Sequence, residues 1–510
     1  MNHNLFSALR HAFPSDLDAT AIETGDGPPL YYTWRDLERG TAMLANLLES
    51  LALQPGARIA VQTEKSVEAL MLYLAVLRAG FVYLPLNNAY QSSEIEYFIG
   101  NAEPSVFVCA PRHFGWISRL AFSAGTAHVF TLGDDRSGSL LQRAAVHGDL
   151  HTPAQRLADE LAAILYTSGT TGRSKGAMLS HGNLLSNAEV LKTLWGWREG
   201  DVLIHALPIF HVHGLFVASH GALLSGSKMI WFSRFDARAV IARLPDATVF
   251  MGVPTLYVRL LGEATLTREA CRHMRLFISG SAPLLIETFD DFHVRTGHTI
   301  LERYGMSETV MLTSNPYALK DGFRRGGTVG FPLPGVDVRV LDDAGEACPP
   351  GEIGHLQVRG PNVFKGYWRM PEKTAEEFTA DGWFKTGDVG KIDAQGYVTI
   401  VGRSKDLIIS GGYNVYPAEI EGVLNDMAGV AESAVIGVPH ADFGEAVVAV
   451  VVARVGAAPD GSALIVELKA KIANFKVPKH VFVVDELPRN TMGKVQKNLL
   501  REQHKGLFAS

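Results

Sequence analysis

The stretch that most constrains this chain is residues 166–176, where glycines and hydroxyl side chains follow directly on the apolar residues 161–165. It holds three glycines, five Ser or Thr residues, Arg173 and Lys175. Glycine adopts positive φ without steric cost, so such a loop brings backbone N–H groups close to an anion while the hydroxyls and the two cations add donors. We therefore predict a loop that binds a polyphosphate.

The segment after this loop predicts a helix. Ser180 is a good N-cap residue, and apolar side chains recur behind it at helical spacing as a buried stripe: Leu184, Ala188, Leu191 and Trp195. The loop is thus expected between a strand and a helix.

Two other interpretations of the loop are weaker. A Walker phosphate loop requires Gly-Lys followed by Ser or Thr, whereas Gly172 is followed here by Arg173 and Lys175 by Gly176. A flexible linker seldom interrupts a hydrophobic strand and helix with interspersed Arg and Lys.

Length and composition limit the class of protein. A chain of 510 residues predicts at least two domains, and a net charge of −6 without a basic block disfavours a nucleic-acid partner. Cys109, Cys271 and Cys348 form no C-x-x-C pair, which argues against a disulfide framework and a zinc site and fits a reducing compartment. The most apolar stretch, residues 69–86, is broken by Arg78 and Gly80 and is a poor membrane span. Residues 1–14 resemble no export signal, so we expect a cytoplasmic protein.

Alternating strands and helices predict parallel βαβ units. Helices are expected at residues 37–53, 66–79 and 94–101, and strands at residues 58–62, 81–86, 105–109, 202–204, 228–232, 247–251 and 276–279. Short glycine-rich segments follow at residues 336–341, 354–359 and 396–401, and a mixed module follows with helices at 417–424 and 464–472 and strands near 435 and at 446–453. The predicted fold is α/β: a large N-terminal domain of βαβ subdomains plus a small β-barrel, residues 1–403, and a smaller mobile α+β C-terminal domain, residues 404–510.

Two further stretches carry candidate site residues. Gly280, Ser281 and Ala282 follow a predicted strand and would let a flat adenine lie against the backbone, although a plain strand-to-helix turn explains them equally well. Residues 302–309 place an aromatic ring, a hydroxyl and the carboxylate of Glu308 in one loop, and such a carboxylate suits Mg²⁺ on ATP oxygens. The alternative for this second stretch is a helix start with a capping box.

Together these stretches resemble the adenylate-forming superfamily, which comprises acyl-CoA synthetases, peptide-synthetase adenylation domains and luciferases. The resemblance implies that ATP is bound by the loop and by residues of the later stretches: Thr167, Ser168, Gly169, Thr170, Thr171, Gly172, Lys175, Gly280, Ser281, Ala282, Tyr304, Gly305 and Ser307. It also implies Mg²⁺ near Thr167 and Glu308.

Three stretches toward the C-terminus continue the resemblance. It implies that Asp388 holds the ribose hydroxyls, that Arg403 contacts the ribose or phosphate, and that Lys405 lies at a hinge between domains. Gly411, Gly412 and Tyr413 would line the pantetheine channel of CoA. Lys494 resembles the catalytic lysine of the superfamily, because a flexible ammonium neutralises the two anions that meet when a carboxylate attacks a phosphate. An exposed lysine is otherwise only a solubilising charge.

The chain resembles malonyl-CoA synthetases more closely than other acyl-CoA synthetases. The stretches that carry this are residues 63–70, 206–215, 301–306, 360–368 and the loop of Lys494. A dicarboxylate needs a cation for its unreacting carboxylate, and the planar fork of Arg303 suits that task. The alternative is an Arg303 that pairs with Glu302 or a neighbouring carboxylate for structure alone.

Two histidines, His211 and His213, form an H-x-H pair without a third ligand at suitable spacing, so zinc is disfavoured. The resemblance instead places His211 beside the acyl pocket, as a catalytic or gating residue. Three positions depart from the pattern of the family that the chain resembles. Ser307 stands where that family more often has Thr, Val212 replaces a frequent Thr, and residues 310–312 are more apolar than the family pattern leads us to expect. Our hypothesis is that Val212, Met311 and their neighbours line the space around the substrate α-carbon, so that methylmalonate is accepted alongside malonate.

The predicted reaction converts ATP, malonate and CoA to malonyl-CoA, AMP and pyrophosphate through an acyl-adenylate, in a monomer or weak homodimer. The alternatives are a synthetase for a short or medium monocarboxylate, an adenylate-forming oxidase or luciferase, a carrier-protein loading module and a catalytically silent nucleotide-binding scaffold.

Overall fold

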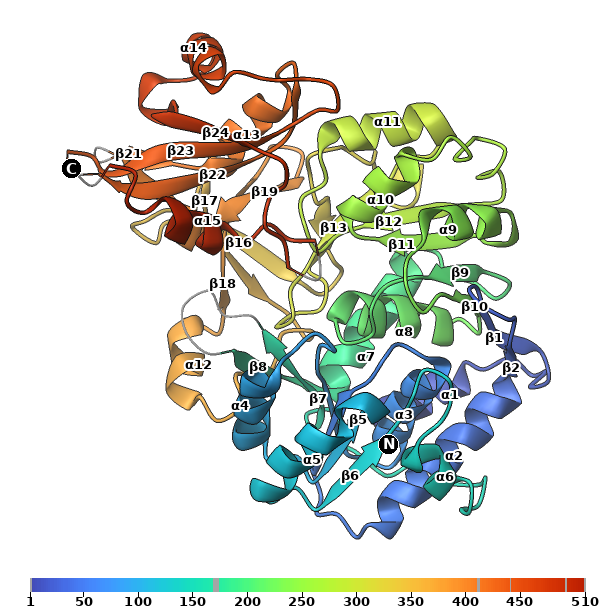
Figure 1. The fold of residues 1–510 in the computed structure, drawn as a ribbon. Coiled ribbons are helices and arrows are strands. Elements are labelled where there is room, and N and C mark those ends of the chain that lie inside the picture. The colour runs from blue at the N-terminus through green and yellow to red at the C-terminus, as the bar shows by residue number, and fades with distance from the viewer. Residues whose placement is uncertain (1, 168–173, 411–412, 441, 491–492, 509–510) are drawn as a thin grey trace. The chain divides into compact units, whose positions relative to one another are not determined.

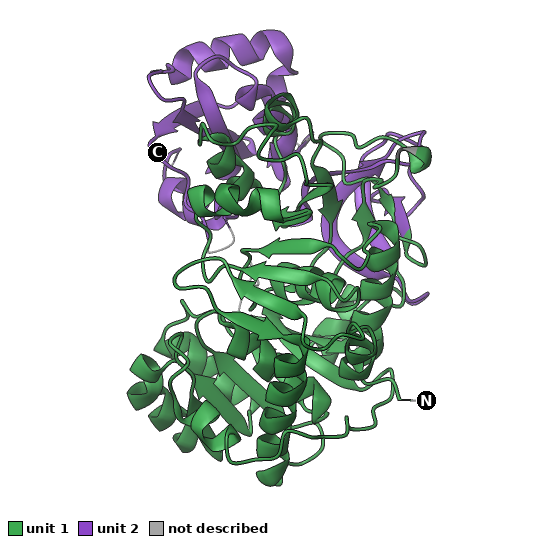
Figure 2. Cartoon of the chain, turned by 90° about the vertical axis from the view of Figure 1, so that its right-hand side faces the viewer, with its two compact units in different colours: residues 1–337, 359–379 green, residues 338–358, 380–510 purple. Residues whose placement is uncertain are grey.

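The computed structural model describes residues 2–167, 174–410, 413–440, 442–490 and 493–508 (Figure 1). The chain divides into two compact units (Figure 2). The first contains Met1–Asp337 and Arg359–Thr379, and the second contains Val338–Val358 and Ala380–Ser510. The predicted domain boundary at residue 403 therefore lies inside the second unit, because the small β module groups with the C-terminal segment.

A six-stranded sheet lies in the first unit, in the order β6-β5-β3-β4-β7-β8. All neighbours are parallel except β7 and β8, which are antiparallel. The strands are β3 (Arg58–Gln62), β4 (Val82–Pro85), β5 (Val106–Cys109), β6 (His128–Thr131), β7 (Leu161–Thr167) and β8 (Lys175–Ser180). The parallel βαβ prediction is confirmed here.

A nine-stranded sheet completes the first unit, in the order β15-β14-β13-β12-β11-β9-β10-β1-β2. Its centre is parallel and its edge pairs are antiparallel. The strands are β1 (Thr20–Thr24), β2 (Tyr31–Thr33), β9 (Val202–His205), β10 (Lys228–Trp231), β11 (Val249–Gly252), β12 (Leu276–Ser279), β13 (Leu301–Tyr304), β14 (Thr313–Ser314) and β15 (Phe331–Pro332).

The helices of the first unit begin at side chains suited to capping. Thr33 and Ser180 both form capping boxes, and the Ser66 side chain accepts a hydrogen bond from the Ala69 N–H. The helices are α1 (Leu5–His11), α2 (Trp34–Ser50), α3 (Val67–Arg78), α4 (Ser92–Ala102), α5 (Phe114–Ser123), α6 (Ser139–Ala144), α7 (His181–Leu194), α8 (Ser219–Leu223), α9 (Ala237–Arg243), α10 (Pro254–Leu261), α11 (Ile286–Thr296) and α12 (Pro371–Glu377).

One local prediction is wrong. The loop after β7 leads into a second strand, β8, and not directly into a helix. β8 pairs antiparallel with β7 from Tyr166↔Gly176 and Thr167↔Lys175 onward, and α7 starts only after β8 ends. The short segment 175–180 has too few residues to reveal its period, whereas pairing with β7 satisfies its backbone groups. The predicted buried stripe of α7 is confirmed.

The second unit holds two smaller sheets. The module predicted as a barrel is a four-stranded sheet of β16 (Asp337–Leu341), β17 (Gly354–Arg359), β18 (Phe384–Ile392) and β19 (Val398–Arg403). The other sheet contains β20 (Ile408–Ser410), β21 (Tyr413–Val415), β22 (Val430–His440), β23 (Gly444–Ala453) and β24 (His480–Val484). Its helices are α13 (Pro417–Asn425), α14 (Gly461–Lys471) and α15 (Lys497–His504).

Each unit has its own apolar core. In the first unit, α3 is buried along its whole length, and a cluster around Phe98 and Phe107 packs against the six-stranded sheet. In the second unit, β22 and β23 carry valine-rich faces into two clusters, one on each side of the sheet. Among the described residues, no helix is both long and apolar enough to span a bilayer.

Candidate active site

The two ends of the predicted phosphate loop are fixed by the fold. Thr167 ends β7 and lies opposite Lys175, which begins β8. The Tyr97 hydroxyl, from α4, donates a hydrogen bond to the Ser174 carbonyl at 2.7 Å. The loop residues Ser168, Gly169, Thr170, Thr171 and Gly172 lie outside the described residues.

Tyr367 connects this loop to Glu308. The Lys175 ammonium lies 4.2 Å from the centre of the Tyr367 ring, and the Tyr367 hydroxyl donates to Glu308 Oε1 at 2.9 Å. The Glu308 carbonyl accepts from the Phe364 N–H at 2.8 Å. Through Tyr367, the structure therefore connects Glu308 to β8, the strand that follows the loop. Tyr367 itself was missed, although it lies in the stretch 360–368 that supported the resemblance.

Glu308 lies in a turn and not at a helix start. Residues 307–309 form the turn between β13 and β14, and Glu308 is buried. A Cβ on Gly305 would lie 1.9 Å from the Val310 carbonyl oxygen and 2.6 Å from Met311 Cε, so only glycine fits there. Tyr304 ends β13, and its carbonyl accepts from the Leu312 N–H at 2.9 Å. Ser307 is half-buried beside Glu308.

Arg303 is a buried cation with unused donors. Its side chain is 2% exposed, and its Nε and Nη2 atoms have no hydrogen-bond partner among the described residues. The guanidinium packs so closely on Gly280 that a Cβ there would lie 2.4 Å from Cζ. Burial lowers the pKa of Arg303 to about 9. Two buried donors without partners indicate a site for an acceptor that the protein itself does not supply.

The structural alternative for Arg303 is not supported. Glu302 and Arg303 are consecutive on β13, so their side chains point to opposite faces of the sheet. Glu302 Oε1 instead accepts from the Leu284 N–H at 3.2 Å, and burial raises the pKa of Glu302 to about 8. No described residue forms an ion pair with Arg303.

Of the two histidines, His213 is the one that contacts Ser281, which follows the glycine that packs on Arg303. His213 Nδ1 lies 3.3 Å from Ser281 Oγ, and Ser281 has a φ of +74°. Burial, reinforced by the charge of Arg303, holds the pKa of His213 well below its ordinary value. His211 packs against Phe210 with ring centres 4.9 Å apart, and burial lowers its pKa to about 4. The H-x-H spacing alone did not indicate which of the two histidines lies beside Ser281.

The other predicted substrate residues are buried in the same unit. Val212 precedes a π-helical segment, η2 (His213–Ala218), and Met311 follows the Glu308 turn. Ala282 is half-buried next to Ser281. π-helical turns are rare and often occur at functional sites.

Lys65 is a second basic residue, partly buried, and it supports the π-helical segment through His205. This role was not predicted from the sequence. Lys65 Nζ lies 3.0 Å from His205 Nδ1 and donates to the His205 carbonyl at 2.8 Å. His205 Nε2 lies 2.9 Å from the Gly214 carbonyl oxygen. A Lys65 ammonium in this position donates to Nδ1, which leaves the Nε2–H to donate to Gly214 inside η2, although burial lowers the pKa of Lys65 well below its ordinary value. The stretch 63–70 contained Lys65 but offered no signal for this role.

In the second unit, the remaining charged residues gather at the end of β19. Arg403 Nε lies 2.8 Å from Asp388 Oδ1. Desolvation lowers the pKa of Lys405 to about 8. Desolvation and the nearby charge of Arg403 also lower the pKa of Lys494. Asp388, Arg403, Lys405 and Lys494 thus form one cluster within this unit.

The predicted CoA residues are only partly described. Tyr413 is exposed, and its ring stacks on Phe475 with centres 4.7 Å apart. Gly411 and Gly412 lie outside the described residues.

Comparisons with known proteins identify the family of this chain. The family model "AMP-binding enzyme" matches residues 10–368, and the model "AMP-binding enzyme C-terminal domain" matches residues 419–494. The solved structure of ATP-bound MatB from Rhodopseudomonas palustris is 55% identical, covers 100% of both chains and has a TM-score of 0.96.

Curated relatives cover most of the chain as well. A malonate–CoA ligase of Arabidopsis thaliana is 34% identical, over 88% of this chain and 78% of its own length. A feruloyl-CoA synthase of an Amycolatopsis species is 35% identical, over 95% of this chain and 96% of its own length. The chain belongs to the AMP-binding enzyme family.

Proposed function

We propose that this protein is an acid–thiol ligase that joins malonate to CoA and converts ATP to AMP and pyrophosphate. The observation that carries the choice of substrate is Arg303, whose buried Nε and Nη2 have no acceptor among the described residues. The second carboxylate of a dicarboxylic acid offers two acceptor oxygens to such a fork. The names of the malonate–CoA ligase relatives support the same substrate.

The reaction has two steps. One malonate carboxylate attacks the α-phosphorus of ATP, which forms malonyl-adenylate and releases pyrophosphate. The sulfur of CoA then attacks the acyl carbon, loses its proton and displaces AMP. We assign the charge neutralisation in the first step to Lys494, because an ammonium stabilises the charge that develops as two anions meet.

ATP would be bound by residues that the fold places at strand ends and turns. In this proposal, the phosphates are bound by Thr167, Lys175 and the loop between them. The ribose is bound by Asp388 and Arg403, and the adenine lies against Gly280 to Ala282. Tyr304, Gly305 and Ser307 complete the nucleotide site. The ATP-bound state of the similar MatB structure supports the assignment of ATP as substrate.

Glu308 and Thr167 are suitable residues for Mg²⁺. The chain of contacts from Thr167 across the ladder to Lys175, then to Tyr367 and Glu308, gathers a carboxylate and a hydroxyl beside the phosphate loop. Mg²⁺ prefers one or two carboxylates together with phosphate oxygens and water. When bound, the ion would withdraw charge from the phosphate oxygens of ATP.

The remaining assignments concern the second step and the acyl pocket. We assign residues 404–510 to a mobile domain that turns about Lys405, with Gly411, Gly412 and Tyr413 along the pantetheine channel. His211, Val212 and Met311 line the acyl pocket in this proposal, and the apolar Val212 favours acceptance of methylmalonate alongside malonate.

A substrate panel tests the proposal. The purified protein is incubated with ATP, Mg²⁺ and CoA together with malonate, methylmalonate, succinate, acetate, propionate or a longer fatty acid, and the thioesters are identified by mass. We expect preference for malonate. In Arg303→Met, kcat/KM for malonate should fall about 100-fold, since a charge-assisted pair is worth roughly 1.5–3 kcal/mol, while acetate turnover stays within a few-fold.

Arg324→Met is the matched control. Arg324 is a half-buried arginine of the first unit, and it already donates to the Thr299 carbonyl at 2.7 Å and to the Pro316 carbonyl at 3.1 Å. We expect this variant to lose stability without a change in the malonate-to-acetate ratio. A wild type that prefers a monocarboxylate, or an Arg303→Met that keeps its malonate preference, would contradict the dicarboxylate assignment.

A further inference from the structure

The backbone is strained at Val310, directly after the turn of residues 307–309 that carries Glu308. Val310 has a φ of +57°, in the left-handed region. A β-branched residue is a genuine outlier there, because its Cγ atoms crowd the backbone. Such a conformation persists only where the surroundings impose it.

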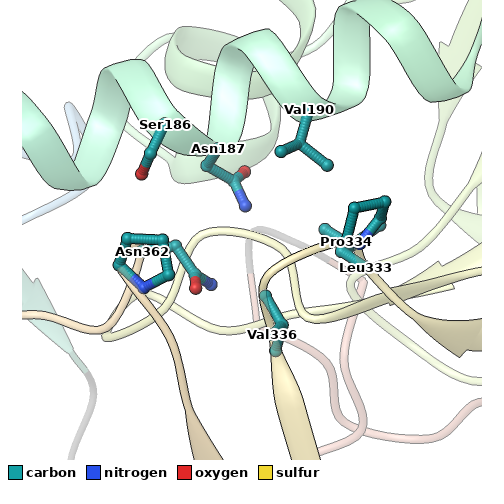
Figure 3. A pocket seen from close by; sticks show the side chains of 8 residues that line it. Ser186, Asn187, Val190, Leu333, Pro334, Val336 and Asn362 are labelled. Carbon is teal, nitrogen blue, oxygen red and sulfur yellow. The ribbon is translucent and has the colours of Figure 1, made fainter.

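Two buried side-chain amides supply that constraint. Asn362 Nδ2 donates to the Thr309 carbonyl at 2.7 Å and to the Met311 carbonyl at 2.8 Å. Asn187 Nδ2, from α7, donates to the same Met311 carbonyl at 2.9 Å. The residues on both sides of Val310 are therefore held by their carbonyl groups. Figure 3 shows both asparagines in the wall of one small pocket.

Burying the oxygens of these two side-chain amides lowers the free energy of unfolding of the protein. Asn187 is 2% exposed and Asn362 1%, and the Oδ1 atom of each has no partner among the described residues. A buried acceptor without a hydrogen bond is unfavourable. What these residues provide is thus their donors, aimed at the turn.

The clamped backbone leads directly to the proposed functional side chains. Glu308 precedes Thr309, and its own carboxylate and carbonyl are held by Tyr367 and Phe364. Met311 follows Val310. A change in the φ and ψ angles of residues 309–311 would redirect Met311 and pull on the backbone of Glu308, so loss of the clamp would displace both side chains.

We propose that Asn187 and Asn362 are positioning residues that hold the 309–311 turn in its strained conformation and thereby orient Glu308 and Met311. The consequence for turnover rests on the proposed function; the consequence for the turn itself does not. Asn187 also connects the turn to α7, the helix that follows the phosphate loop and β8.

The test uses Asn187→Leu and Asn362→Leu, which keep the side-chain shape but remove the donors. Asn46→Leu is the matched control, because Asn46 also bridges two carbonyls, those of Gly148 and Leu150 at 2.7 and 3.0 Å, far from this turn in sequence. In amide hydrogen exchange, peptides covering residues 305–315 should exchange at least tenfold faster in the two clamp variants than in wild type or Asn46→Leu, as expected of local opening. Unchanged protection would overturn the proposal whatever the substrate.

The kinetic arm measures carboxylate-dependent exchange of pyrophosphate into ATP at a temperature where all variants are folded. We expect kcat to fall on the order of 10²-fold in the clamp variants with KM for ATP within about threefold, because misplacement of a catalytic group by an ångström has that effect. Wild-type exchange with another acid but not malonate would contradict the proposed function, and the ratios would then be measured with that acid.

A second substitution separates strain from general destabilisation. Gly and Asn adopt the left-handed conformation more readily than Val. Val310→Gly and Val310→Asn are therefore expected to restore at least part of the lost protection and turnover when combined with Asn362→Leu. A loss in Asn362→Leu that neither substitution reduces would show that the amide does not act by holding Val310.

Discussion

At the scale of single residues, burial gives two neighbours on β13 opposite electrostatic roles. Arg303 and Glu302 are both nearly inaccessible, and burial disfavours the charged form of each. Two donors of Arg303 have no partner among the described residues, which is the basis of the anion site that we propose. Glu302 remains a neutral acid near pH 7 that accepts from the Leu284 N–H.

Glu302 predicts a pH dependence of stability. Its pKa is about 8 in the folded chain against 4.5 in the unfolded one, so its contribution is fully present below pH 4.5 and is lost as the pH rises through 8. Glu302→Gln should remove this loss and give a higher midpoint of thermal unfolding than wild type at pH 8.5, with little difference at pH 5. Parallel pH profiles for the two proteins would contradict the assignment, and Glu372→Gln, at an exposed carboxylate, is the control.

At the scale of elements, the first unit assembles its site from strand ends and one returning segment. β7 and β8 fix the ends of the proposed phosphate loop, β13 carries Arg303 and leads to Glu308, and residues 359–379 return to place Tyr367 between Lys175 and Glu308. The carboxyl ends of parallel strands are where α/β sheets bind ligands.

Tyr367→Phe tests this connection. The substitution keeps the ring under Lys175 and removes only the hydroxyl that donates to Glu308. We expect the rate of adenylation to fall about 10- to 150-fold, since a hydrogen bond to a charged group contributes roughly 1.5–3 kcal/mol, with a smaller change in KM for malonate. Pyrophosphate exchange measures the effect.

The matched control is Tyr32→Phe, because the Tyr32 hydroxyl donates to Glu68 Oε1 at 2.6 Å in the same unit but away from the loop. That variant should exchange pyrophosphate at the wild-type rate. If both variants lose activity equally, the Tyr367 hydroxyl has no special role.

At the scale of the whole molecule, the chain separates its candidate groups into two units. Arg303, Glu308, Lys175 and His213 belong to the first unit, and Asp388, Arg403, Lys405 and Lys494 to the second. A ligase of two steps can use such a division, because a group needed for one step can be moved away in the next.

Lys494 predicts a separation of the two steps. Lys494→Ala should lower adenylation on the order of 10³-fold while thioester formation from supplied malonyl-adenylate continues, since the ammonium stabilises only the first transition state. A lysine is cationic below its pKa, and the pKa of Lys494 is lowered, so adenylation should decline with rising pH before the ordinary lysine value of 10.5 is reached. Lys494→Arg should move this decline to higher pH. Equal loss of both steps in Lys494→Ala would contradict the division.

Many of the strands and helices could be predicted, because the pattern of apolar, turn and capping residues within a short segment is sufficient to identify them. Strands such as 58–62 and 276–279 are short apolar runs bounded by turns, and α3 and α7 begin at Ser66 and Ser180, which cap them. The hairpin of β7 and β8 was not predictable, because a six-residue strand shows its period only through its partner.

For the candidate site, motifs and composition were enough to predict which chemical groups are available and roughly in which loops: the glycines and cations around residue 170, Arg303, Glu308, Asp388 and Lys494. Which of these groups come into contact depends on the folded chain. The fold brings His213 to Ser281, Tyr367 to Glu308, and the amides of Asn187 and Asn362 to the carbonyl groups of the residues that flank Val310. The physical reason is that turn chemistry and periodicity act over a few residues, whereas burial, and with it every unpaired donor and shifted pKa, depends on segments that are distant in the chain.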